Sequence, residues 1–155
     1  MKIINKVANG LVVLITFLMF SCNANDKNEL LVPEDWFYNS GIDSASEFKD
    51  YFDELKVEIS SNLKSKVAKK ISYPITIKMA EGKALSIKNE AEFVENYALI
   101  INKTVVDAIA KQEFNAIRKY SNGVMVGRGV LWISSIKLNE SDEYQIKIFA
   151  INNWV

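Results

Sequence analysis

The sequence lacks histidine altogether, and Cys22 is its only cysteine. Without histidine, Ser-His-Asp and Cys-His catalysis are excluded, and so are zinc sites built from His or Cys ligands. A single cysteine cannot form a disulfide within the chain, so side-chain packing must stabilise the folded state by itself. No glycine-rich phosphate loop of the GxxxxGK[ST] type occurs either. Carboxylates, tyrosines and lysines remain for acid–base chemistry, and no cofactor or metal is expected.

A surplus of basic charge is missing as well. The 155 residues include 19 basic and 19 acidic side chains. If residues 1–21 are removed as a leader, Lys2 and Lys6 leave with them, and a formal charge of −2 remains. A nucleic-acid-binding domain would show a basic excess, so nucleic acid is not an expected partner. Residues 22–155 have the usual size of one domain.

The N-terminal leader contains the longest apolar run. Lys2 and Lys6 precede Val7 to Phe20, a run of 14 residues. As a helix this run would span about 21 Å. The hydrocarbon core of a bilayer is about 30 Å thick and needs about 20 apolar residues. The run is therefore too short for a membrane span and typical of a signal peptide over residues 1–21.

The end of the leader carries a lipidation motif. Met19-Phe20-Ser21-Cys22 resembles the lipobox of bacterial lipoproteins. In that family the cysteine is lipidated and the signal is cut before it. The resemblance implies an exported cell-envelope protein, on the periplasmic side or the outer surface, anchored in the membrane by lipid on Cys22. The alternative is an ordinary secretory signal, which would leave a free thiol in an oxidising compartment.

Residues 22–42 are predicted to be a tether followed by an aromatic segment. Residues 23–29 are polar and have no periodicity, which favours a flexible tether. Trp36-Phe37-Tyr38 then follows Pro33. Three consecutive aromatic side chains cannot all face one way. Either the segment is a lid strapped onto the domain, or it is an exposed patch that docks a partner.

Residues 43–155 are predicted to form one domain that begins with helices. Ser44 and Glu47 have the spacing of a capping box. Phe48, Phe52 and Leu55 then share one helical face. Further helices are expected over residues 63–71, 89–101 and 102–112.

The period then changes to that of strands. Tyr73 to Met79 alternates apolar and polar residues, and Pro74 indicates an edge strand or the start of a strand. Asn122-Gly123 is a hairpin signal, and Gly127-Arg128-Gly129 indicates a bulge or sharp bend. Strands are also expected over residues 85–87, 114–120, 124–136 and 144–151.

This order of elements resembles the nuclear-transport-factor-2-like (NTF2-like) group of the cystatin-like superfamily. The residues that carry the resemblance are Tyr73-Pro74-Ile75, Glu92-Phe93 with Tyr97, and Gly127-Arg128-Gly129-Val130-Leu131-Trp132. It implies an α+β fold in which N-terminal helices pack on a strongly curved antiparallel sheet around a cone-shaped cavity. It does not imply an activity, because one fold hosts many functions.

Arg128 is the first candidate for a binding residue. An arginine between two glycines either lies over a sheet edge or points into the mouth of the cavity, where it would suit a carboxylate. Tyr97 and Trp132 are expected as core aromatics whose polar tips need partners. Tyr120 and Trp36 are further candidates for contact with a ligand or partner.

Two main functional hypotheses follow. The first is a non-catalytic, lipid-anchored module that binds an envelope protein or a small apolar or acidic ligand. The second is a cavity enzyme, an isomerase or hydrolase, that uses a carboxylate with Tyr or Trp donors. Asp107 and Glu113 are candidate acids, although both are expected at solvated helix ends. A passive structural lipoprotein is a third possibility.

Overall fold

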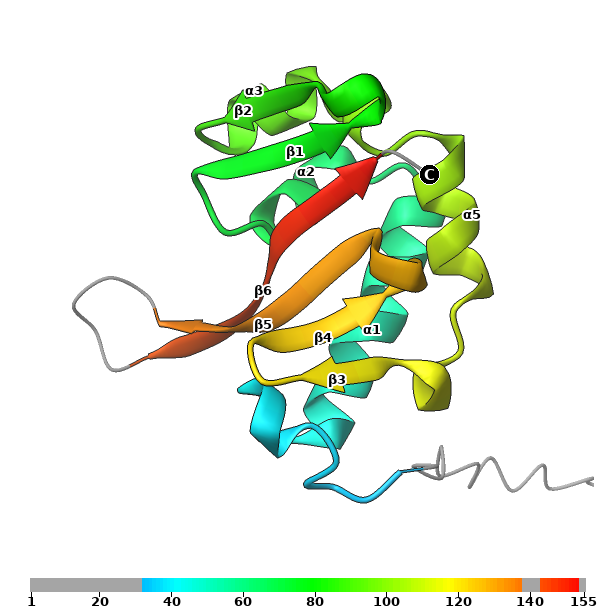
Figure 1. Cartoon of the computed structure of the whole chain (residues 1–155), viewed down its shortest axis with the longest axis vertical. Helices are drawn as coiled ribbons and strands as arrows, with labels where there is room; N and C mark the ends of the chain where they lie inside the picture. The colour runs from blue at the N-terminus through cyan, green and yellow to red at the C-terminus, as the bar shows by residue number, and fades with distance from the viewer. Residues whose placement is uncertain (1–31, 138–142, 154–155) are drawn as a thin grey trace, which may run out of the picture.

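The computed structural model describes residues 32–137 and 143–153, which form helices packed on one side of a six-stranded sheet (Figure 1). The strand order in the sheet is β2-β1-β6-β5-β4-β3. The predicted α+β class, with N-terminal helices packed on a sheet, is therefore confirmed. The predicted leader (residues 1–21), Cys22 and the predicted tether (residues 23–29) lie outside the described residues.

The elements follow the order that the sequence predicts, except that residues 114–116, expected as the start of a strand, form a 3₁₀ turn and the strand is confined to residues 118–120. The helices are α1 (Ala45–Ser60), α2 (Lys64–Lys69), α3 (Glu90–Glu95), α4 (Tyr97–Ile100) and α5 (Lys103–Lys111). The strands are β1 (Ile75–Met79), β2 (Ala84–Ile87), β3 (Arg118–Tyr120), β4 (Gly123–Val126), β5 (Leu131–Lys137) and β6 (Tyr144–Asn153). Short 3₁₀ turns are η1 (Tyr38–Ser40), η2 (Ala80–Gly82), η3 (Phe114–Ala116) and η4 (Gly127–Gly129).

The long helix α1 begins at the predicted cap. Ser44 Oγ accepts a hydrogen bond of 3.0 Å from the backbone N–H of Glu47. A second acid, Glu34, reaches the same helix end and accepts 2.8 Å from Ser46 Oγ. Hydrogen bonds from the hydroxyls of Ser44 and Ser46 hold the pKa of the Glu34 carboxyl below its usual value. The negative carboxylate stabilises the N-terminus of α1, because the helix dipole is positive there.

Glu34 belongs to a segment, residues 32–42, that lies against the domain and is named the strap here. Within it Phe37 is fully buried, and its ring centroid lies 5.0 Å from that of Phe48 in an edge-to-face contact. Trp36 and Tyr38 on either side remain exposed. The aromatic run thus splits between core and surface, as the lid interpretation predicts.

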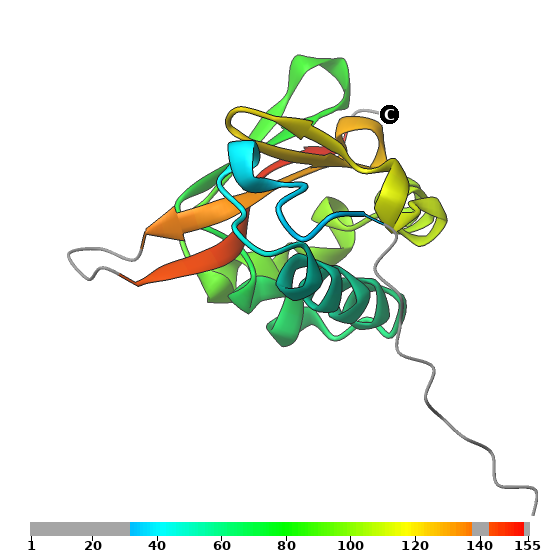
Figure 2. The ribbon, with the colours of Figure 1, turned by 90° about the horizontal axis from the view of Figure 1, so that it is seen from below.

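The sheet differs from the expected strongly curved antiparallel sheet. It is mixed, because β1 pairs in parallel with β6 through Ile77↔Ile151. It is also open and not strongly curled (Figures 1 and 2). The parallel pair arises because α3, α4 and α5 carry the chain to β3 at the far edge. The meander then returns beside β1. Pro74 immediately precedes β1, which is not an edge strand.

The space between α1 and the sheet is filled with side chains. Phe48, Phe52 and Leu55 of α1 are buried against inward residues of the central strands, including Leu131 and Ile133. Pairing carries this inner row across three strands, through Val124↔Ile133 and Ile133↔Ile148. These side chains occupy the region in which the sequence predicts a cone-shaped cavity. Burial of this face supplies the main stabilisation of the domain.

Candidate functional site

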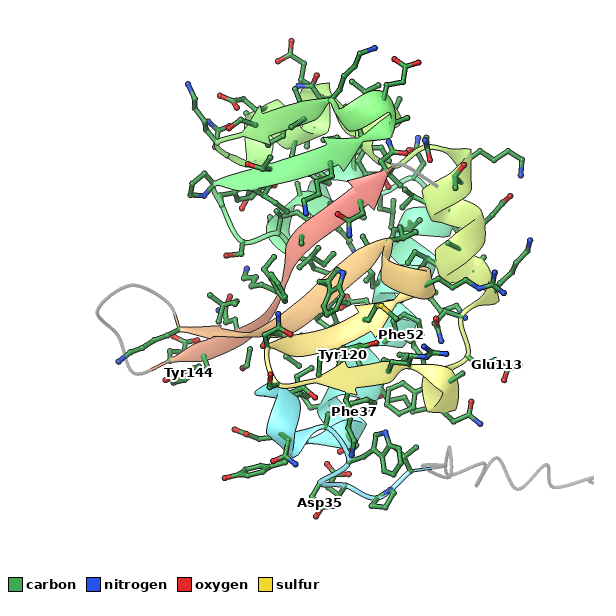
Figure 3. All side chains as sticks on the ribbon, viewed as in Figure 1. Asp35, Phe37, Phe52, Glu113, Tyr120 and Tyr144 are labelled. Atoms are coloured by element: carbon green, nitrogen blue, oxygen red, sulfur yellow. The ribbon has the colours of Figure 1, made fainter. Side chains whose placement is uncertain are left out.

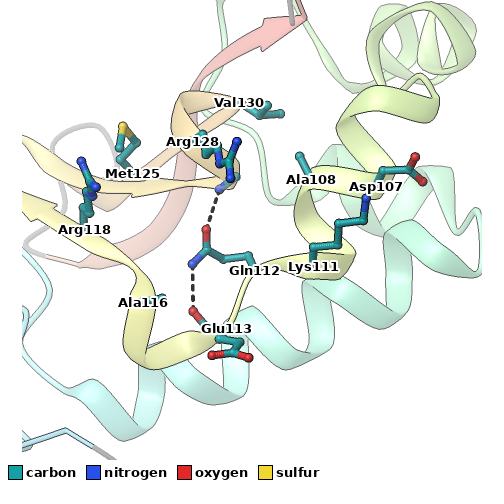
Figure 4. Close-up of a pocket in the computed structure, with 11 residues that line it drawn as sticks. Asp107, Ala108, Lys111, Gln112, Glu113, Ala116, Arg118, Met125, Arg128 and Val130 are labelled. Carbon is teal, nitrogen blue, oxygen red and sulfur yellow. Dashed lines mark hydrogen bonds between the residues drawn. The ribbon is translucent and has the colours of Figure 1, made fainter.

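A groove of about 960 Å³ opens on the outside of the domain, between α5 and the ends of β3 and β4 (Figure 4). It is called the arginine groove here. Its lining residues are Asp107, Ala108, Lys111, Gln112, Glu113, Ala116, Arg118, Met125, Gly127, Arg128 and Val130. The groove combines residues from five elements, namely α5, η3, β3, β4 and η4, and folding brings α5 beside η4.

The turn η4 forms one wall of the groove and has an unusual backbone. Gly127, Arg128 and Gly129 are consecutive left-handed residues, with φ of 61°, 59° and 98°. Glycine adopts this conformation without penalty, whereas an L-residue such as arginine is disfavoured by roughly 1–2 kcal/mol. Gly127 is also constrained by space, since a Cβ there would lie 3.1 Å from Ala108 Cβ on α5. The two glycines therefore allow the turn, and Arg128 between them has to adopt the same left-handed conformation.

Hydrogen bonds fix this turn on both sides. Gln112 Oε1 accepts 3.0 Å from the backbone N–H of Gly127, and Asn152 Nδ2 donates 2.6 Å to the carbonyl of Gly129. Gln112 Nε2 also donates 2.8 Å to the carbonyl of Glu113 (Figure 4). The backbone carbonyl of Gln112 accepts 2.9 Å from Lys56 Nζ on α1. The backbone that carries Arg128 is thus held in place by hydrogen bonds on both sides.

Both arginines of the chain line this one groove. Of the 19 basic residues in the sequence, only Arg118 and Arg128 are arginine. Within the described residues neither forms an ion pair or a side-chain hydrogen bond. Lys111 adds a third positive charge beside them. A planar guanidinium without a partner is suited to bind a carboxylate in bidentate fashion.

The two acids of the groove do not neutralise the arginines. Asp107 Oδ2 accepts 2.7 Å from Lys103 Nζ, and this hydrogen bond lowers the pKa of the Asp107 carboxyl. Glu113 is exposed at the opposite rim (Figure 3). Both acids are solvated, as expected, and neither has the buried setting that would make it a general acid at neutral pH.

The groove continues onto the outer face of the sheet, the side that α1 does not cover. Pairing places Arg118, Met125 and Trp132 in one row on this face, through Arg118↔Met125 and Met125↔Trp132. Tyr120 lies two residues beyond Arg118, and its ring centroid is 5.2 Å from that of Trp132. Tyr120 is 42% exposed and lies on the front of β3 in Figure 3.

A β-bulge between Trp132 and Ile133 turns Phe149 towards the same face. Its ring passes so close to Gly123 that a Cβ there would lie 2.9 Å from Phe149 Cε1. Gly123 therefore makes room for an aromatic side chain on the outer face. The name outer face is used below for Arg118, Tyr120, Met125, Trp132 and Phe149.

The predicted site residues have different positions. Arg128, Trp132 and Tyr120 lie in or beside the groove. Tyr97 lies in the core, as expected, and is 3% exposed. Trp132 was expected in the core as well, but it is only partly buried, since its side chain lies on the face of the sheet that α1 does not cover. Trp36 lies on the strap, where Lys119 Nζ is 4.1 Å from its ring centroid and donates 2.9 Å to its carbonyl oxygen.

Arg118 and Met125 were missed by the sequence reasoning. Arg118 sits in a predicted strand with no glycine or motif beside it, so only the pairing of β3 with β4 reveals its position. One signal was available in composition. The rarity of arginine among 19 basic residues marks both arginines as special.

A buried acid does exist, but it lies elsewhere. Glu58 on α1 is 3% exposed, and burial raises the pKa of its carboxyl, although Lys70 Nζ lies 3.7 Å from Oε2. In the described residues Glu58 Oε2 and the hydroxyls of Tyr51 and Tyr97 have no hydrogen-bond partner. Glu58 is not a lining residue of the groove. The groove therefore contains cations for binding, without a buried acid for proton transfer.

Comparisons of the chain with protein-family models, curated proteins and solved structures gave no match. Among the residues that the structure describes, no helix has the length and apolar character of a membrane span. The same part of the chain contains no cluster of three or more His, Cys, Asp or Glu residues that could hold a metal ion. The functional argument therefore rests on the groove and the outer face.

Proposed function

We propose that this protein is an exported, lipid-anchored and non-catalytic binding domain whose arginine groove takes an anionic ligand. The observation that carries the proposal is the convergence of the only two arginines, both unpaired within the described residues, in one groove. The lipobox-like leader ending at Cys22 supports the address in the cell envelope. The order of elements supports a relation to the NTF2-like group.

The strained turn at Arg128 supports a functional role for this side chain. A non-glycine residue in the left-handed region is disfavoured, and such strain is found at binding and catalytic sites more often than elsewhere. Among the described residues, the Arg128 side chain forms no hydrogen bond, ion pair or cation–π contact that would stabilise the fold. We infer that the arginine is retained for what it binds.

The cavity-enzyme hypothesis has less support. It needs a carboxylate with a raised pKa that faces an accessible pocket. Within residues 32–137 and 143–153, the carboxyl with a raised pKa is that of Glu58, which is buried on α1, whereas the acids of the groove are solvated. The binding hypothesis requires only the charges and the rigid turn that the groove provides.

The anchor is tested by the variant Cys22→Ala. We expect the full chain to pellet with membranes and Cys22→Ala to remain in the soluble fraction, because each buried CH₂ of an acyl chain contributes about 0.8 kcal/mol to membrane binding. Fractionation followed by immunoblotting measures the effect. Continued pelleting of Cys22→Ala would contradict the lipid anchor.

The binding role is tested by affinity capture from the native envelope after crosslinking. The full chain is compared with Arg128→Ala and with Lys88→Ala, which removes a positive charge from the exposed loop between β2 and α3. We expect captured material, protein or small molecule, to be lost in Arg128→Ala and retained in Lys88→Ala. Equal capture by all three would contradict the groove as the binding site.

A further inference from the structure

The outer face has no cover among the described elements. The helix α1 packs on the other face of the strands β3, β4, β5 and β6. No helix crosses the face that is turned to the viewer in Figure 1. Arg118, Met125 and Trp132 form a row across three strands, and the Tyr120 ring lies against Trp132. A half-exposed row of large side chains of this kind is uncommon on a surface without a partner.

The arginine groove and the outer face are one continuous surface. Met125 lines the groove and also stands in the row, between Arg118 and Trp132. The turn η4 closes the other side, since a Cβ on Gly129 would lie 3.6 Å from Met125 Sδ and 4.0 Å from Trp132 Nε1. A ligand of sufficient length can therefore contact Arg128 and the aromatic side chains together.

The composition of this surface is that of a protein interface. Trp, Tyr, Met, Phe and Arg are enriched at the centres of protein–protein interfaces, and Trp, Tyr and Arg dominate their binding energy. The five side chains named as the outer face are all of these types, and the small residues Gly123 and Ala150 lie among them. Met125 adds a flexible, polarisable side chain that adapts to the shape of a partner.

The charges indicate the chemistry of the partner. Arg118 and Arg128 have no carboxylate partner in the described chain, so carboxylates of a partner can pair with them. A densely charged polyanion fits less well, because Glu113 stands at the rim and a phosphate polymer needs repeated basic contacts. A second copy of this surface would bring arginines against arginines. A protein segment with a few acidic residues beside an apolar residue is complementary to both the arginine groove and the outer face.

We infer that the arginine groove and the outer face together form a docking surface for an acidic protein segment. Its Asp or Glu side chains pair with Arg118 and Arg128, and an adjacent aromatic or aliphatic side chain packs on Met125, Trp132 and Tyr120. This inference rests on the proposed function and specifies the partner of the same site.

The test is an array of synthetic 12-residue peptides probed with the full chain in detergent. Four peptide classes are compared: acidic with aromatic residues, acidic alone, aromatic alone, and basic with aromatic residues. The variants are Arg118→Ala/Arg128→Ala, Trp132→Ala and the control Lys88→Ala. Circular dichroism of each variant shows that it is folded.

We expect the acidic–aromatic peptides to bind at least about tenfold more tightly than each other class, since loss of one buried anchor changes affinity by about that factor. The preference should disappear in Arg118→Ala/Arg128→Ala and in Trp132→Ala, and persist in Lys88→Ala. Heparin or inorganic phosphate should not displace these peptides at equal charge concentration.

Three outcomes would overturn the inference: no preference for acidic–aromatic peptides, a preference that survives in the double variant, or displacement by heparin or phosphate. Self-association of the chain through this face, seen by analytical ultracentrifugation and lost in Trp132→Ala, would overturn it too. If envelope capture still depends on Arg128 while the peptide preference fails, the proposed function stands and this inference falls. If neither depends on Arg128, both fall.

Discussion

The two faces of the same sheet differ in what their side chains do. Ile133 points inward and is fully buried, whereas Trp132, its neighbour on β5, lies on the outer face and contacts Tyr120. Because side chains alternate along a strand, one stretch of chain serves both faces. The inner face is closed by α1 and contributes stability. The outer face is open, carries the arginines and contributes a binding surface. Substitutions on the two faces should therefore have separable effects.

The largest effect is expected on the inner face. Ile133→Ala should lower the free energy of unfolding by about 2–5 kcal/mol, because it removes buried methyl groups and leaves a cavity in a close-packed core. Urea denaturation followed by circular dichroism measures this change. Binding by the molecules that remain folded should be unchanged.

The matched variant is Trp132→Ala, one residue away on the opposite face. Its side chain is only half-buried, so the unfolding free energy should fall by less than in Ile133→Ala, by roughly 1 kcal/mol. If Trp132→Ala is as destabilising as Ile133→Ala, the assignment of stability to the inner face and binding to the outer face is wrong.

The second prediction separates stability from binding at one residue. Arg128→Gly should raise the free energy of unfolding by roughly 1 kcal/mol, since glycine adopts the left-handed conformation freely. The same variant should lose ligand capture, because the guanidinium is gone. Thermal unfolding and envelope capture on the same preparation measure both effects.

Glu81→Gly is the control for Arg128→Gly. Glu81 also has a positive φ, of 58°, in a turn that follows β1 and lies outside the groove. Glu81→Gly should be stabilising to a similar degree and leave binding intact. A loss of stability in Arg128→Gly would mean that the arginine supports the fold after all.

The smallest effects on stability are expected for Glu54 and Glu58, two acids of α1 beside Lys70. Burial raises the pKa of Glu58, so its ionised form weakens the fold as pH rises through that raised pKa. The hydrogen bond from Lys70 lowers the pKa of Glu54, whose contribution is lost as pH falls. Glu58→Gln should therefore be more stable than the parent at neutral pH, by less than about 1 kcal/mol, with the difference vanishing in acid.

Glu54→Gln serves as the counterpart and should be slightly less stable than the parent at neutral pH, with the difference again vanishing in acid. Thermal unfolding from neutral pH down to about pH 2, below the lowered pKa of Glu54, gives both profiles. Profiles of the same sign for the two variants would refute the assignment of Glu58 as a buried, costly charge.

Much of the fold could be predicted because it is encoded locally. The cap at Ser44, the hairpin at Asn122-Gly123 and the period-two run before Met79 are patterns within a few residues, and each lies where expected. The parallel pairing of β1 with β6 joins segments about 70 residues apart, and no local pattern specifies it. The same holds for the filled space under the sheet, which depends on how side-chain volumes sum.

The candidate site was predicted only in part for the same reason. Arg128 stands between two glycines, so its unusual setting is visible in the chain itself. Arg118 joins it only through the register of β3 on β4. Tyr97 lies in the core, as its helical position predicts, whereas Trp132, also expected in the core, is only partly buried because it points to the outer face of β5. Chemical type is local, whereas convergence on one surface is a property of the tertiary fold.

The strap also bears on the exposed edges of the sheet. An open sheet has two edge strands, and the free N–H and C=O groups of an edge can pair with another chain and start aggregation. The strap runs beside β3 (Figures 1 and 2), and Lys119 Nζ donates 2.9 Å to the carbonyl oxygen of Trp36, so strap backbone lies next to this edge. The other edge, β2, is short and is flanked by Lys83 and Lys88. One edge thus has the strap beside it, and the other is short and flanked by lysines; both features disfavour pairing of the sheet edges with another chain.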